Sequence, residues 1–107
     1  EVVIGSDDME NSRKWLENLN DDDLLFIKQI VLHSGSLKEV ANYYGVTYPT
    51  LRNKLNSLIQ KIEFFESIEN AKDDPYIDHI KVLVNEKKLS MSVATNLIVE
   101  YHSLNKK

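Results

Sequence analysis

Apolar residues recur three and four positions apart along most of this chain, and this spacing constrains the fold more than any other feature. The clearest run is Tyr48, Leu51, Leu55, Leu58, Ile62 and Phe65. No stretch alternates apolar and polar residues strictly enough to specify a strand. Three glycines and two prolines in 107 residues are also too few for the many tight turns of an all-β protein. The sequence therefore predicts an all-α fold.

Residues that favour helix starts and ends divide this pattern into separate helices. The expected helices cover about residues 8–19, 21–34, 37–44, 48–68, 75–87 and 91–104. Gly35 and Gly45 are placed to end the second and third of these, because glycine adopts the left-handed backbone that closes a helix. Ser36 and Glu39 have the spacing of a capping box at the start of the third.

The spacing within each helix predicts which residues face inward. These are Leu24, Ile27, Ile30 and Val31 in the second helix, Leu37, Val40, Ala41 and Tyr44 in the third, Ile77, Ile80, Leu83 and Val84 in the fifth, and Val93, Ala94, Leu97, Ile98, Tyr101 and Leu104 in the last. The apolar seam of the long fourth helix extends past Leu58. Beyond that residue it is either buried by later helices of the same chain or pairs with a second chain.

The helices group into two predicted parts joined by a polar stretch. Residues 9–68 would form a helix-turn-helix domain with an N-terminal helix, residues 69–74 a linker, and residues 75–107 a C-terminal helical hairpin. Residues 1–8 precede the first methionine and are either an expression leader or a disordered native segment.

Charge is distributed unevenly along the chain. The net charge of −4 averages an acidic start, with eight acids and two bases in residues 1–23, and a basic middle. Residues 24–62 hold five bases against Glu39 alone, and the next acid is Glu63. Residues 63–107 carry a net charge of −2. A basic segment of this kind favours a nucleic-acid partner, and random fluctuation over a solvated face is the alternative.

Several classes of protein are not expected. The absence of cysteine excludes disulfides and thiolate zinc sites and agrees with a cytoplasmic location. Apolar runs are too short for a bilayer span, and no signal peptide is recognisable. The three histidines are scattered, and the aspartates at 21–23 lack the ligand spacing of a calcium loop. Without a phosphate-binding loop or a nucleophile motif, we expect no metal, no cofactor and no enzyme activity.

The segment from Leu37 to Leu58 has the arrangement of a helix-turn-helix: a short helix with Ala41 at the crossing point, a turn at Gly45, and a second helix. Opposite its apolar stripe, the second helix carries amides flanked by basic residues. Amides can hydrogen-bond adenine, and basic side chains bind phosphates or guanine, although the same residues would also suit a solvent-facing surface. The candidate DNA-binding residues are Lys38, Thr47, Tyr48, Thr50, Arg52, Asn53, Lys54 and Asn56.

Individual roles can be assigned to some of these candidates. Thr47 or Thr50 would bind a phosphate together with the amides at the helix start, and Asn53 and Asn56 would contact base edges. Arg52, Lys54 and Lys38 would neutralise phosphates. Tyr48 is as suited to packing as to DNA contact, and Pro49 is expected to have a structural role at the helix start.

Two motifs within residues 15–62 resemble a known family. The segments Gly35-Ser36-Leu37-Lys38-Glu39-Val40 and Gly45-Val46-Thr47-Tyr48-Pro49-Thr50-Leu51-Arg52 are similar to those of the uncharacterised bacterial domain-of-unknown-function family 2089. The resemblance implies a helix-turn-helix thought to bind DNA, similar in shape to sigma-factor region four and to the LuxR-type output domain. Many members carry a zinc ribbon with paired cysteines before this domain, and this chain lacks it. The tail resembles a C-terminal helical hairpin suspected of oligomerisation.

These features together predict a DNA-binding transcriptional regulator with no cofactor. The helix from about residue 48 would enter the major groove of double-stranded DNA. A homodimer is expected, because two copies double the phosphate contacts of a module with few bases. The alternative is a protein-interaction adaptor that uses the three-helix fold and binds a protein partner through the C-terminal hairpin. The acidic flanks of the chain favour that alternative.

Overall fold

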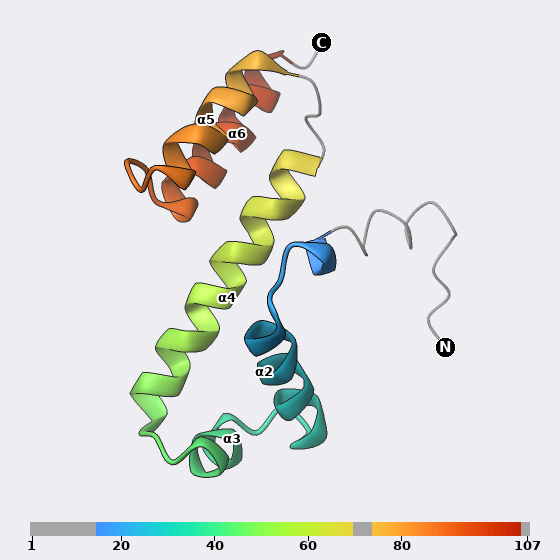
Figure 1. Ribbon diagram of the computed structural model, residues 1–107, viewed down its shortest axis with the longest axis vertical. Helices are drawn as coiled ribbons and strands as arrows, with labels where there is room; N and C mark the ends of the chain where they lie inside the picture. Colours follow the sequence, from blue (N-terminus) through green and yellow to red (C-terminus); the bar gives the residue numbers. More distant parts are fainter. Residues whose placement is uncertain (1–14, 70–73, 106–107) are drawn as a thin grey trace, which may run out of the picture. The chain divides into compact units, whose positions relative to one another are not determined.

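The computed structural model describes residues 15–69 and 74–105, and every regular element in these ranges is a helix. The all-α prediction is therefore confirmed. A helical turn at residues 15–17 precedes the main helices. These are α2 (Asp21–Leu32), α3 (Leu37–Tyr44), α4 (Tyr48–Glu69), α5 (Pro75–Asn85) and α6 (Met91–Asn105) (Figure 1). The predicted leader, the start of the predicted helix over residues 8–19 and most of the predicted linker lie outside the described residues.

The chain divides into two compact units, and α4 contributes to both. Residues 17–59 hold α2, α3 and the first half of α4. From residue 60 onward, the rest of α4 packs with α5 and α6. In the part of the chain that the structure describes, no helix combines the length and the apolar character needed to cross a membrane.

Helix α2 is closed at both ends by nearby residues. Asn20 and Asp23 form a capping box, in which Asn20 Oδ1 accepts from the Asp23 amide at 2.8 Å and Asp23 Oδ2 accepts from the Asn20 amide at 3.2 Å. The helix ends earlier than predicted, because Ser34 as well as Gly35 adopts a positive φ. The Gly35 amide donates back to the Ile30 carbonyl at 2.8 Å and so satisfies the end of the helix.

Helix α3 keeps half of its predicted capping box. Ser36 Oγ accepts from the Glu39 amide at 3.3 Å. The reciprocal half is wrong, because the Ser36 amide donates instead to the His33 carbonyl at 3.0 Å. At the other end Gly45 adopts a φ of 69° and its amide donates to the Asn42 carbonyl, so the predicted end of this helix is confirmed.

The core of residues 17–59 is built from all three of their helices and Leu19, which lies two residues before α2. Its buried members are Leu19, Phe26, Val40, Ala41, Leu51 and Leu58. The predicted inner face of α2 is wrong for Leu24 and Val31, which are exposed, whereas Ile27 and Ile30 are half-buried. Because α2 carries apolar residues on most sides, the spacing of these residues did not show which side of the helix faces the core. Turning Phe26 inward buries the largest side chain of the helix and therefore the most apolar surface.

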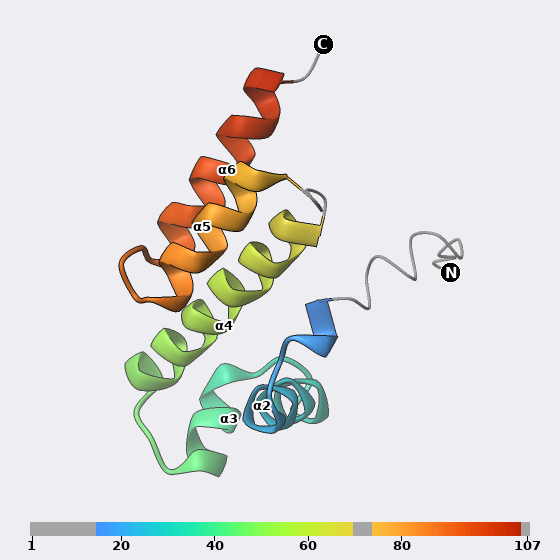
Figure 2. The same cartoon turned by 45° about the horizontal axis from the view of Figure 1, so that its top comes forward.

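The second core lies between the end of α4 and the antiparallel pair of α5 and α6, which lie side by side in both views (Figure 2). Its buried members are Phe64, Ile77, Ile80, Ala94 and Ile98. The seam of α4 beyond Leu58 is thus covered within the chain, since Ile62 is half-buried and Phe65 packs against this core. The spacing predicted Phe65 and overlooked its neighbour Phe64, which is the more deeply buried of the two.

Capping hydrogen bonds lie at the starts of the last two helices. Asp74 Oδ1 accepts from the Tyr76 amide at 2.9 Å at the start of α5, and Ser90 Oγ accepts from the Val93 amide at 3.1 Å at the start of α6. Helix α5 ends before the predicted Lys87, which adopts a φ of 60°. The predicted inward positions of Val93 and Leu104 are wrong. Both side chains are exposed, because the α6 face that meets the core is centred on Ala94 and Ile98.

Candidate nucleic-acid interface

The connection between α3 and α4 consists of Gly45, Val46 and Thr47 (Figure 2). A Cβ atom at Gly45 would have no atom within 4 Å, so the left-handed backbone, and not a lack of space, favours glycine there. The Val46 amide donates to the Ala41 carbonyl at 3.0 Å and completes the closure of α3. This short connection leads the chain directly into α4, as the helix-turn-helix prediction requires.

Helix α4 begins with two threonines whose hydroxyl groups are bonded to each other. Thr47 Oγ1 accepts from the Thr50 amide at 3.4 Å and donates to Thr50 Oγ1 at 2.9 Å. Thr47 therefore caps the helix, and its hydroxyl has no proton left for another acceptor. The Thr50 hydroxyl keeps its own proton and is exposed. Of the two predicted phosphate ligands, Thr50 is thus the better donor.

Three of the predicted DNA-binding residues lie on the exposed side of α4. Arg52, Asn53 and Asn56 are exposed, whereas Leu51 is buried on the other side of the helix. Within residues 15–69 and 74–105, none of these three polar side chains takes part in a hydrogen bond or an ion pair. Lys38, in the first turn of α3, is likewise exposed. Guanidinium, amide and ammonium groups in this state are available to phosphates and to base edges.

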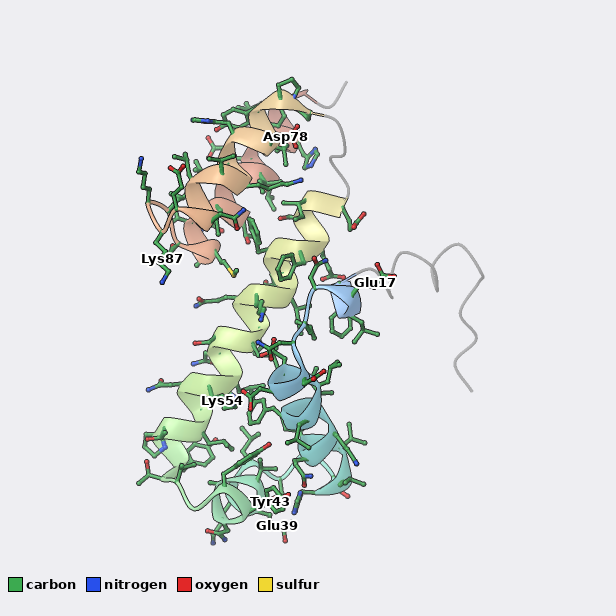
Figure 3. All side chains as sticks on the ribbon, in the orientation of Figure 1. Glu17, Glu39, Tyr43, Lys54, Asp78 and Lys87 are labelled. Carbon is green, nitrogen blue, oxygen red and sulfur yellow. The ribbon has the colours of Figure 1, made fainter. Side chains whose placement is uncertain are left out.

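Lys54 is placed differently from the other candidates. Its side chain extends from α4, where Figure 3 labels it. The Lys54 Nζ lies 2.9 Å from Oδ2 of Asp22 and 5.2 Å from the centre of the Phe26 ring. The ammonium group thus joins α4 to the first turn of α2 through an ion pair and a cation–π contact. The charge of Lys54 is already partly satisfied within the protein, which the sequence did not indicate.

Aromatic side chains support the scaffold beside these residues. The Tyr44 ring lies 6.0 Å from that of Phe26 and meets Tyr43 edge-on at 5.1 Å. Burial raises the pKa of Tyr44 above its ordinary value, so this hydroxyl stays neutral at physiological pH. Tyr48, which the spacing placed on the apolar seam, is half exposed at the start of α4 and remains accessible to a ligand.

The acidic and histidine side chains do not converge. In the described ranges, no group of three or more His, Cys, Asp or Glu residues could hold a metal ion. His33 Nδ1 lies 2.7 Å from the Gln29 carbonyl, so this nitrogen carries a proton and donates it within α2's final turn. In the described ranges, the candidate interface therefore consists of exposed polar side chains.

Three helices, a glycine turn and an exposed polar face on the second helix of the motif define a helix-turn-helix protein. More particularly, residues 19–65 match the family model described as Domain of unknown function (DUF2089)-HTH. The match confirms, for this segment, the resemblance drawn from the motifs that begin at Gly35 and Gly45. No curated protein and no solved structure matches the chain significantly.

Proposed function

We propose that this protein binds double-stranded DNA through residues 17–59 and regulates transcription, with the first half of α4 in the major groove. The observation that carries the proposal is the exposed face of Arg52, Asn53 and Asn56, whose donors have no partner among the residues that the structure describes. This face lies in a stretch without an acid between Glu39 and Glu63, so α4 itself offers no carboxylate that would repel phosphate there.

Each candidate has a distinct role in the proposed complex. Asn53 and Asn56 contact base edges, where an amide can both donate to and accept from adenine. Arg52, Lys38 and the Thr50 hydroxyl contact phosphates and fix the position of α4 in the groove. The charge of Lys54 is already shared with Asp22, so we expect its contribution to affinity to be smaller than that of Arg52.

The proposed protein is a binding protein and not an enzyme, and it needs no cofactor. It acts in the cytoplasm as a homodimer, because a single copy offers few cations and two copies would contact two half-sites. The C-terminal hairpin of α5 and α6 is then free to take part in contacts with another protein.

The proposal is tested by fluorescence anisotropy of mixed-sequence duplex DNA, titrated with the full chain at several salt concentrations. We expect binding at low salt that weakens as salt rises, with a log–log slope of about 0.9 per phosphate contacted. Absence of binding at low salt, where even non-specific contacts would be detected, would contradict the proposal and favour the adaptor alternative.

A double variant, Arg52→Ala with Asn53→Ala, tests whether the exposed face of α4 is the part that binds. We expect the salt slope to fall by about 1, and discrimination between selected and scrambled sites to fall by roughly 1–3 kcal/mol. The matched control is Lys88→Ala with Asn96→Ala, which removes the same charge and an amide from exposed positions after residue 60. Equal losses in the two double variants would place the interface elsewhere.

A further inference from the structure

Helix α2 presents a second apolar face opposite the one that it buries. Leu24, Leu25, Val31 and Leu32 are exposed by 41%, 43%, 70% and 64%. The outward face of a helix on the protein surface normally carries polar residues. Exposed aliphatic side chains gathered on one face of a helix are typical of a surface that binds a partner.

Two opposite charges lie on this same face, on either side of a leucine pair. With Leu24 at 0° around the helix axis, Lys28 lies at about 40°, Asp21 at about 60° and Leu25 at about 100°. Asp21 and Lys28 are each displaced by roughly 5 Å along the axis from the point between the leucines. Both side chains are exposed, and within the described residues neither has an ion-pair partner.

We propose that this face of α2 binds the same face of a second copy of the chain. The two α2 helices run antiparallel about a two-fold axis that passes between Leu24 and Leu25. Asp21 of each copy then faces Lys28 of the other, and the four leucines pack around the axis. Such a contact is isologous, since one patch meets its own copy.

The charge pattern favours a second copy over a different partner. A uniformly acidic surface would be repelled by Asp21 and a uniformly basic one by Lys28, whereas an antiparallel copy matches both. The other apolar surface considered for pairing, the seam of α4 beyond Leu58, is occupied by the core of α5 and α6. This face of α2 is thus the contact surface of the homodimer in the proposed function. The inference rests on the proposed homodimer and not on DNA binding.

Charge reversal tests this contact without DNA, so its outcome is separate from that of the binding experiment. Sedimentation equilibrium measures the dimer dissociation constant of the full chain and of Asp21→Lys and Lys28→Asp. Each variant alone places two like charges in contact, and we expect its dissociation constant to rise at least about tenfold. An equimolar mixture of the two restores both opposite-charge pairs. We expect its dissociation constant to return to within about threefold of the original.

Controls separate this contact from effects on folding or on net charge. Asp78→Lys and Lys81→Asp make the same charge changes on α5, and we expect them to leave association unchanged. Circular dichroism checks that every variant keeps its helices. A wild-type chain that stays at 12.4 kDa throughout the micromolar range would overturn the proposal. So would a mixture of the two α2 variants that associates no better than either one alone.

Discussion

At the scale of single residues, Lys54 belongs both to the scaffold and to the proposed interface. Its side chain is 41% exposed, and its ion pair with Asp22 is therefore partly screened by water. The contact over the Phe26 ring places the same ammonium beside the single aromatic residue of α2, which is buried. One charge thus helps to hold α4 against α2 while belonging to the proposed DNA interface.

Replacing Lys54 by methionine tests this structural role. The Lys54→Met variant keeps an unbranched side chain over Phe26 and loses the charge, so we expect the free energy of unfolding to fall by about 0.5 kcal/mol. Urea unfolding at low and at high salt measures the change, and the difference should shrink in high salt. Lys38→Met is the control, because Lys38 has no ion-pair partner among the described residues. Equal losses of unfolding free energy in Lys54→Met and Lys38→Met would show that the ion pair between Lys54 and Asp22 does not stabilise the protein.

At the scale of elements, residues with a left-handed backbone conformation mark the ends of α2, α3 and α5. Ser34 and Gly35 follow α2, Gly45 follows α3, and Lys87 follows α5, with φ between 54° and 81°. In the helix-turn-helix, the position of Gly45 also determines where α4 begins relative to α3. The backbone of one residue therefore controls the geometry of the proposed interface.

Substitution of Gly45 tests that control. Gly45→Ala meets no neighbouring atom, so its cost is the strain of a left-handed backbone, and we expect about 1 kcal/mol of lost stability. Gly45→Asn should lose less, because asparagine tolerates this conformation better than alanine. Chemical denaturation of the two variants gives the comparison. Equal stabilities for alanine and asparagine would show that the backbone conformation is not the source of the cost.

At the scale of the whole molecule, the sequence indicated the helices well and their orientations less well. Helix starts depend on nearby capping residues such as Ser36 and Ser90, so local patterns predict them. The inner side of α2 could not be chosen, because a helix that is apolar on most sides fits a core in several rotations. For α4, by contrast, the spacing of the apolar residues placed Arg52 and Asn53 on the exposed side, where the structure has them. The pairing of Lys54 with a residue 32 positions earlier depends on tertiary packing and left no local signal.

The division into two units predicts that damage to one core stays within its unit. Phe64 is 3% exposed in the core shared with α5 and α6, and we expect Phe64→Ala to cost about 3–5 kcal/mol. Amide hydrogen exchange should show protection lost in α5 and α6 and kept in α2 and α3. Phe65→Ala is the matched control and should cost less, since Phe65 is only half-buried. Equal loss of protection in α2 and α3 would mean that the units unfold together.

Because residues 17–59 form one unit from helices that follow one another in the chain, the order of synthesis is also an order of assembly. Residues 17–59 can complete their core while Ile77 and Ile98 are still to be added by the ribosome. During that interval Phe64 has no partner from α5 or α6 and is open to contact with other nascent chains. Glu63, its exposed neighbour in the sequence, places a charge there that opposes aggregation until the last helices arrive.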